Sequence, residues 1–433
     1  MDLDKGKIAI FLFIGGVGLL VVIFAVGCFL RGGSESPTNV KATLNFWGVF
    51  DKASAYNSAL TSFQGRYPNI TINYTSFDSV ENYERSLLNA LAAGKGPDIF
   101  MIRNNDLFRK INKIFPLSAS KYTLLDIRHS FPAIVKNDFT RGTNIYALSL
   151  SIDTLAFVYN RSIFNEAAIV FPPETWQEFQ GLVPKLTEKN ESGDITQAGV
   201  ALGWSGKNVN HSKHILSLLM MQNGAEMVDD KYTSALFSSR EGRDALAFYA
   251  GFTNPDSATY TWNDQLPNSL DLFLQEKVAV ILEYSSALKT IKSTSPFINF
   301  EVVTIPQPED SERDVAYANY WGYTVSGQTQ YFDLAWDFIL LLTTDQDVAL
   351  GYLQNTGKPP ALSGLITRYI NDPELGAFAK QALIARSWAE PDPERVSLIF
   401  DEAIESVVDK KLSVGEALIE AQARVTRMME IQF

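Results

Sequence analysis

Residues 91–102 read Leu-Ala-Ala-Gly-Lys-Gly-Pro-Asp-Ile-Phe-Met-Ile and join the end of a predicted helix to a buried strand. The Gly-Lys-Gly-Pro segment at 94–97 ends the helix, because glycine and proline both disfavour its continuation. Two strands, predicted at 43–47 and 70–74, precede this stretch with a helix after each. This order predicts a parallel sheet with helices on its faces, and ligands bind beyond the carboxyl ends of such strands.

A second group of elements begins near residue 153. Thr175 and Glu178 predict a capping box at the start of a helix, and the chain after residue 331 has mostly helical periodicity. Alternation of β-branched and aromatic residues predicts further strands at 154–159, 198–202, 277–283, 300–305 and 321–325.

The composition restricts the classes of function. With 433 residues, of which 46% are hydrophobic and 20% charged, the chain can form two ordinary domains or one two-lobed unit. The net charge of −12 argues against a nucleic-acid-binding body, since phosphate contacts need a basic surface. Three histidines and one cysteine exclude a Cys/His zinc framework and an intrachain disulfide. We expect no cofactor.

The N-terminal residues 1–30 predict a membrane anchor or a lipoprotein signal. The apolar run 8–30 would span roughly 34 Å as a helix, enough to cross a bilayer. Cys28 follows small residues, as in a bacterial lipoprotein signal in which the cysteine is lipidated; an uncleaved membrane helix is the alternative. Residues 31–40 form a flexible linker by composition, so either version places a tethered body outside the cytoplasm.

Several segments together resemble the family 1 extracellular solute-binding proteins, the sugar-binding receptors of bacterial ABC importers related to maltose-binding protein. The segment 91–99 is similar to the family's signature before its third strand and is the strongest part of the resemblance. In 273–281, Glu276 and Val280 replace the usual Gly and Met. The other matching segments occur in the family's order at 44–47, 157–164, 173–179, 321–326, 335–339 and 357–361.

The resemblance implies an α/β, two-lobed, periplasmic-binding-protein-like (class II) fold with an N-terminal membrane anchor helix. One lobe would hold 41–152 and 272–328, and the other 153–271 and 329–433. The family implies a receptor that closes around a carbohydrate between its lobes and delivers it to ABC permease subunits without catalysing a reaction. We expect a monomer, bound to the membrane by its N-terminal segment at the outer face of a bacterial cytoplasmic membrane.

A carbohydrate pocket needs flat aromatic rings for the apolar faces of sugar rings and polar side chains for the hydroxyl groups. In the family, ligand groups fall in loops that follow strands or lie at the crossover between lobes. The resemblance therefore implies substrate-binding roles for Trp47, Asp51, Asn104, Asn105, Asp153, Trp204, Tyr284, Trp321 and Trp388.

Alternatives remain for the function and for single residues. A carbohydrate hydrolase would need two carboxyl groups about 5–10 Å apart across the cleft. A receptor of the same fold could instead bind a polyamine or a peptide, or the chain could be a surface protein that has lost transport. Trp47 and Trp321 could belong to the core, Trp176 and Trp336 are expected there, and His211 and His214 are expected to be surface histidines.

Overall fold

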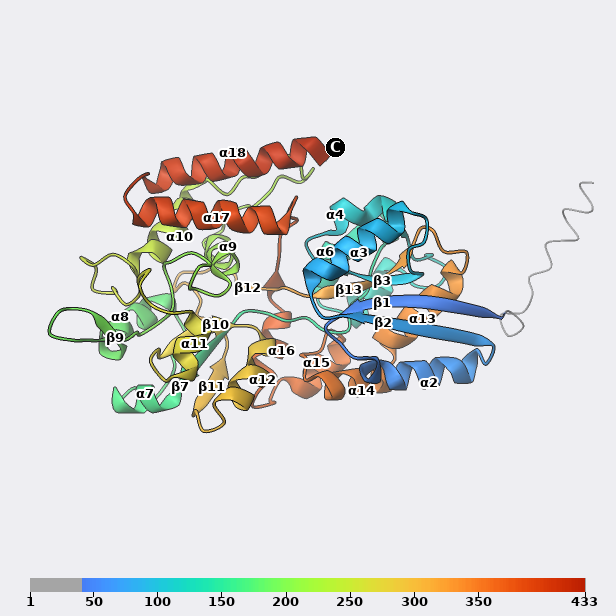
Figure 1. Cartoon of the computed structure of the whole chain (residues 1–433), viewed down its shortest axis with the longest axis horizontal. Helices are drawn as coiled ribbons and strands as arrows, with labels where there is room; N and C mark the ends of the chain where they lie inside the picture. The colour runs from blue at the N-terminus through green and yellow to red at the C-terminus, as the bar shows by residue number, and fades with distance from the viewer. Residues whose placement is uncertain (1–40, 433) are drawn as a thin grey trace, which may run out of the picture. The chain divides into compact units, whose positions relative to one another are not determined.

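The computed structural model describes residues 41–432 (Figure 1). The predicted anchor, the linker and Cys28 lie outside this range. Over 41–432, none of the helices combines the length and the apolar character needed to cross a bilayer.

The described residues divide into two compact units, 41–43 with 63–71, and 44–62 with 72–432. The described part of the first unit holds the start of β1 (Ala42–Val49), the end of α2 (Asn57–Arg66) and the start of β2 (Ile70–Phe77). In that unit the rings of Phe63 and Tyr67 lie 4.7 Å apart. The rest of the five-stranded sheet, the three-stranded sheet and the candidate site belong to the second unit.

The first sheet has five strands in the order β2-β1-β3-β13-β4. Its further members are β3 (Ile99–Arg103), β13 (Trp321–Ser326) and β4 (Ile114–Phe115). The parallel pairing predicted from the N-terminal pattern is confirmed for β1 and β3. Because the chain returns to this sheet late, β13 runs antiparallel to both β3 and β4, so the sheet is mixed.

Helices cover the five-stranded sheet. The helix α3 (Val80–Ala92) starts at the cap Ser79, and its buried Tyr83 hydroxyl bonds both the N–H and the C=O of Met101 at 2.8 Å, which fixes α3 against β3. Buried Trp336 of α13 (Phe332–Thr344) donates to the Phe115 carbonyl at 3.1 Å, so the prediction that Trp336 is core is confirmed. The remaining elements of this group are η1 (Ala53–Tyr56), α4 (Leu107–Lys110), η2 (Ile111–Lys113), α5 (Leu124–Ser130), α6 (Ala133–Phe139), β5 (Thr140–Arg141), β6 (Asn144–Ile145), α14 (Gln346–Thr356) and α15 (Ser363–Tyr369).

The second sheet is antiparallel, with β7 (Ala156–Asn160) between β10 (Val280–Glu283) and β11 (Phe300–Val303). This pairing differs from the expected division of the chain, in which 272–328 belonged with the first lobe. The strand periodicity is local, whereas the choice of partner depends on long-range contacts, so the sequence located these strands but not their sheet. The predicted strand at 198–202 forms only an isolated bridge, from Ala198 to Val278.

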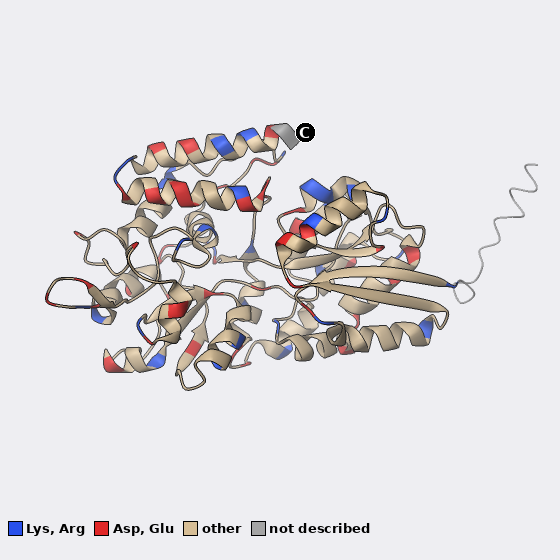
Figure 2. Cartoon of the chain, viewed as in Figure 1, with Lys and Arg blue, Asp and Glu red and all other residues tan. Residues whose placement is uncertain are grey.

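A large apolar core lies under the helices around the three-stranded sheet. The predicted capping box is present at α8 (Trp176–Leu186), where Thr175 and Glu178 bond each other's backbone, and Trp176 is buried as predicted. Figure 2 shows Lys and Arg interspersed with Asp and Glu on α17 (Pro393–Val408) and α18 (Val414–Gln432). The other elements are α7 (Arg161–Glu166), β8 (Glu188–Lys189), β9 (Ile195–Gln197), α9 (Ser212–Gln222), α10 (Arg240–Gly251), α11 (Ser269–Leu274), α12 (Ser285–Thr294) and α16 (Gly376–Ala382).

Two segments, 148–155 and 315–321, connect the two groups of elements, and a third, 383–390, joins α16 to α17 beside them; we call all three the crossing segments. They bond to one another. Thr154 pairs with Ala318, and β12 (Ala316–Tyr317) runs parallel to β14 (Ala385–Arg386). Side chains on these segments are therefore positioned by backbone from both groups.

Candidate functional site

Asp153 lies on the first crossing segment, partly buried and tightly held. Its carboxylate accepts hydrogen bonds from the Ser285 backbone N–H at 3.0 Å, the Ser285 hydroxyl at 2.7 Å and the Thr154 N–H at 3.0 Å. Burial raises the pKa of Asp153 to about 6, although these hydrogen bonds and the charge of Lys358 act in the opposite direction. The geometry fixes an acceptor where the chain passes from one group to the other.

Asp51 is connected to this region through Lys358. The Lys358 Nζ atom lies 2.7 and 2.8 Å from the two Asp51 oxygens, and the Tyr352 hydroxyl donates to Asp51 at 2.8 Å. Asp51 is buried, so this pairing compensates its charge. The same ammonium group acts on Asp153, which places Asp51, Lys358 and Asp153 in one electrostatic neighbourhood.

Histidine and tyrosine side chains gather at the start of α9, and we call His211, His214, Tyr284 and Tyr317 the histidine–tyrosine cluster. The His211 and His214 rings are parallel within 2° at 6.0 Å, and His214 stacks on Tyr317 at 4.8 Å. The Tyr284 hydroxyl lies 2.8 Å from His214 Nδ1, and Glu283 holds His211 Nε2 at 2.9 Å. Burial, followed by the charges of Lys213, His211 and Arg103, lowers the pKa of His214 well below its ordinary value. His214 is therefore neutral at neutral pH.

A row of aromatic rings lies on the five-stranded sheet side: Trp47, Phe77, Tyr83 and Trp321. Neighbouring centroids in this order are 5.2, 5.5 and 5.9 Å apart. Trp47, Phe77 and Trp321 are partly exposed, whereas Tyr83 is buried. The Arg103 guanidinium lies 5.9 Å from the Trp321 ring and 2.5 Å from Glu394 of α17. Trp321 of the row and Tyr317 of the histidine–tyrosine cluster both belong to the crossing segment 315–321.

This combination suits a neutral, hydroxylated ligand. Partly exposed rings offer apolar faces, and Asp153, His211 and His214 offer polar atoms near them. Within 41–432, no group of three His, Cys, Asp or Glu side chains is placed to hold a metal ion.

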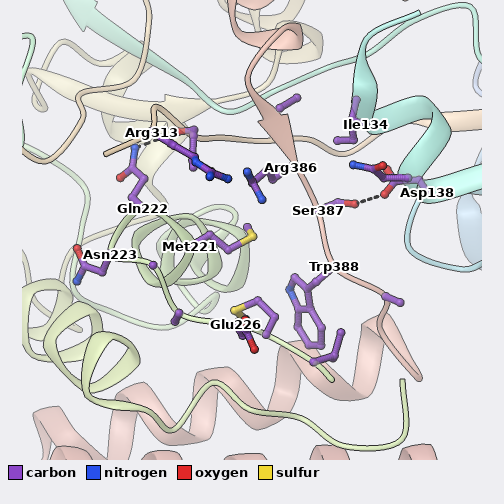
Figure 3. Close-up of a pocket in the computed structure, with 18 of the residues that line it drawn as sticks. Ile134, Asp138, Met221, Gln222, Asn223, Glu226, Arg313, Arg386, Ser387 and Trp388 are labelled. Carbon is purple, nitrogen blue, oxygen red and sulfur yellow. Dashed lines mark hydrogen bonds between the residues drawn. The ribbon is translucent and has the colours of Figure 1, made fainter. Parts of the chain in front are cut away.

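A cavity of about 860 Å³ lies on another part of the crossing segments (Figure 3). Two of the predicted site residues, Asn104 and Trp388, line it. Asn104 donates to Asp138 at 3.4 Å and to the Ala318 carbonyl at 3.3 Å, so its amide is already engaged. The buried Trp388 indole donates to Ser217 at 3.3 Å.

The nine predicted residues therefore fall into different places. Two of the nine, Asn104 and Trp388, line the cavity. Five others belong to the region around Arg103 and Lys358: Trp47, Asp51, Asp153, Tyr284 and Trp321. Trp204 is buried in the core of the second group, and its carbonyl accepts from Tyr249 at 2.7 Å. Asn105 is buried, and its side-chain oxygen has no hydrogen-bond partner among the described residues.

Several residues at the site escaped the sequence interpretation. His211 and His214, expected on the surface, are half-buried: 31% of the His211 side chain is exposed. Their spacing of three on a helix suggested one shared face but not which tyrosines would cover it. The sequence did not indicate a role at the site for Arg103 or Lys358, because a single basic residue at a strand end or after a helix can serve many purposes.

Comparison with known proteins identifies the family of this chain. The profile of the bacterial extracellular solute-binding proteins matches residues 47–349, more than half of the chain. This chain belongs to that family. Its curated relatives include a maltotriose-binding protein of Pyrococcus abyssi, 23% identical over 75% of this chain and 66% of the relative. A multiple sugar-binding protein of Streptococcus mutans is 23% identical over 81% of this chain and 82% of its own length.

Solved structures show the fold. The sugar-binding protein MalE of Xanthomonas citri matches with a TM-score of 0.76 at 19% identity, over 90% of this chain and 98% of that one. A solute-binding protein of Thermotoga lettingae, bound to α-D-tagatose, matches with a TM-score of 0.70 at 21% identity, over 90% of this chain and all of that one. The chain thus has the mixed α/β fold of these two-lobed binding proteins.

Proposed function

We propose that this protein is an extracytoplasmic carbohydrate receptor that delivers its ligand to an ABC permease. Family membership supports a binding protein rather than an enzyme. The maltotriose-binding and multiple sugar-binding relatives support a saccharide as the ligand. One observation carries the proposal: the partly exposed ring of Trp321 and the fixed acceptor Asp153 lie on adjoining crossing segments, where the Asn319 N–H donates to the Asp153 carbonyl at 2.9 Å.

The sugar would bind between the aromatic row and the histidine–tyrosine cluster. Trp321 and Trp47 would stack on the apolar faces of sugar rings, and Asp153 would accept from a hydroxyl group. The neutral state of His214 supports this assignment, because a cation there would favour an anionic ligand instead. Trp204 and Trp388 are left out of this site, since both are buried in the second core.

Sheet pairing supports a revised division into lobes. One lobe would comprise the elements around the five-stranded sheet, up to residue 152 together with 318–369. The other would comprise 153–317 and 376–432, because β10 and β11 pair with β7. The crossing segments would then act as the hinge for closure on the ligand.

The N-terminal segment would tether a monomeric receptor at the outer face of the membrane. The support is the charge-free apolar run 8–30 followed by a linker-like segment. Whether Cys28 is lipidated is decided by mass spectrometry of the membrane fraction, which would detect a diacylglyceryl adduct on a chain that begins at Cys28.

A thermal-shift screen of the full chain against saccharides tests the function. At a ligand concentration 100-fold above Kd the native state gains about 2.7 kcal/mol, which raises Tm by about 3 °C. Trp321→Ala is expected to weaken binding about tenfold, while Phe297→Ala, which removes an aromatic ring that is 97% exposed, leaves it unchanged. A response only to spermidine or peptides, or release of reducing sugar, would replace the proposal with one of its rivals.

A further inference from the structure

Three arginines line the cavity shown in Figure 3, and the sugar site uses none of them: Arg141 lies over the Phe108 ring at 4.3 Å, and the other two are Arg313 and Arg386. Arg313 precedes β12, and Arg386 belongs to β14, so the paired crossing segments bring both to one wall. Figure 3 shows their guanidinium ends pointing toward one another into the hollow. Both side chains are exposed, so solvent screens their mutual repulsion, and an anion between them would accept hydrogen bonds from both.

Arg313 and Arg386, like Arg141 and Arg368 among the described residues, have no anionic partner. Arg103, Arg109 and Arg424 each form an ion pair with a carboxylate. In the part of the chain that the structure describes, the guanidinium groups of Arg313 and Arg386 form neither an ion pair nor a hydrogen bond to a side chain. Their donors are free for a ligand.

The acidic group on the opposite wall is already engaged. Asp138 accepts from the Ser387 hydroxyl at 2.7 Å, from Tyr320 at 2.8 Å and from Asn104 at 3.4 Å, so it does not pair with the arginines. The other lining acids, Glu226, Asp230, Asp310 and Glu312, are exposed to solvent, as the two arginines are, so solvent screens the charges of both signs.

The rest of the cavity lining suits a small ligand that carries hydroxyl groups. The side chains of Asn137, Gln177 and Asn223 line the cavity with amide groups, and Met221 gives an apolar surface beside them. The Gln177 oxygen also accepts from the Glu309 N–H at 3.1 Å and the Asn223 amide donates to the Glu241 carbonyl at 3.3 Å, which leaves the Gln177 NH2 group and the Asn223 oxygen for hydroxyl groups. A volume of about 860 Å³ is within the range of small-molecule sites.

We propose that this cavity binds a phosphate monoester of a small polyol, with the phosphate between Arg313 and Arg386 and the polyol against the amides. Guanidinium groups bond phosphate oxygens in a planar, two-pronged geometry that favours this group over a neutral sugar. The site is separate from the proposed sugar site, because Asp153, Tyr284 and Trp321 do not line the cavity.

Calorimetric titration of the full chain with glucose 6-phosphate tests the inference, with excess glucose present so that a neutral sugar site stays saturated. Saturable binding is expected. Arg313→Gln and Arg386→Gln should each weaken it at least about tenfold, as expected for loss of a charged hydrogen bond. The control Arg368→Gln removes the same charge from α15, which contributes no residue to the cavity lining, and should leave the affinity unchanged.

Three results would overturn the inference: no binding of glucose 6-phosphate, equal loss in all three variants, or unchanged affinity in both cavity variants. Inorganic phosphate should bind at least about tenfold more weakly than glucose 6-phosphate, and equal affinity would refute the polyol part. Maltotriose titrated into the same variants separates the two proposals, since its binding depends on the sugar site alone.

Discussion

Replacing Asp138 with asparagine is expected to change how stability depends on pH. Asp138 lies on α6 and reaches the third crossing segment through its 2.7 Å bond from Ser387. Burial raises the pKa of Asp138 from 3.8 to about 6, against the hydrogen bonds from Ser387, Tyr320 and Asn104, which favour the ionised form. The asparagine side chain would fill nearly the same volume but would not titrate.

The sign and size of the effect follow from linkage. Between pH 3.8 and about 6 the folded chain holds this proton and the unfolded chain does not, so the stability of the natural protein falls as the pH rises through this window. Below this window Asp138 is protonated in both states and costs no stability, and above it the full cost of burying the ionised carboxylate is present. A shift of about two units corresponds to about 3 kcal/mol, since each unit is about 1.4 kcal/mol.

The assay is urea unfolding of both proteins at constant ionic strength from pH 4 to pH 7.5. The free energy of unfolding of Asp138→Asn minus that of the natural protein should rise by about 3 kcal/mol across this range. The effects of all other acids cancel in this difference.

A matched control has the opposite sign. The pKa of Asp126 is lowered by hydrogen bonds from Thr123, so for Asp126→Asn the same difference should fall as the pH rises. A difference that stays flat for Asp138→Asn, or that runs parallel to the control, would refute the reasoning.

Other perturbations have definite expected outcomes. Gly203→Ala should lower the free energy of unfolding in urea by about 2–4 kcal/mol, because the residue has φ +99° and a Cβ would lie 2.8 Å from Thr253 Cγ2. The control Gly251→Ala, where a Cβ would meet no atom within 4 Å, should be neutral or slightly stabilising. Equal effects of the two substitutions would contradict this expectation. Thr175→Ala should lower the free energy of unfolding by about 1 kcal/mol through loss of the α8 cap, and no loss would show that the cap is dispensable. Dialysis against EDTA should leave Tm unchanged, since the described residues form no metal-binding group; a fall in Tm would reveal one.

Local features of the fold, and the parallel pairing that the alternation of the first strands and helices implies, could be predicted from the sequence, whereas the partners of later strands could not. The Thr175 capping box and the β1–β3 pairing follow from short patterns, and both are present. The partner of the strand 280–283 depends on where distant segments meet, so its sheet was assigned differently. The candidate site shows the same limit, because the sequence alone does not distinguish Trp204 from Trp321 as a residue that contacts the ligand. Only the tertiary packing buries the first and leaves the second partly exposed.

Calorimetric titration of the full chain with maltotriose, followed by chromatography of the recovered sugar, tests the central claim most directly. A receptor of this kind should give one saturable binding event and return maltotriose unchanged. No heat of binding with maltotriose or any other saccharide, or recovery of shorter sugars, would contradict the account.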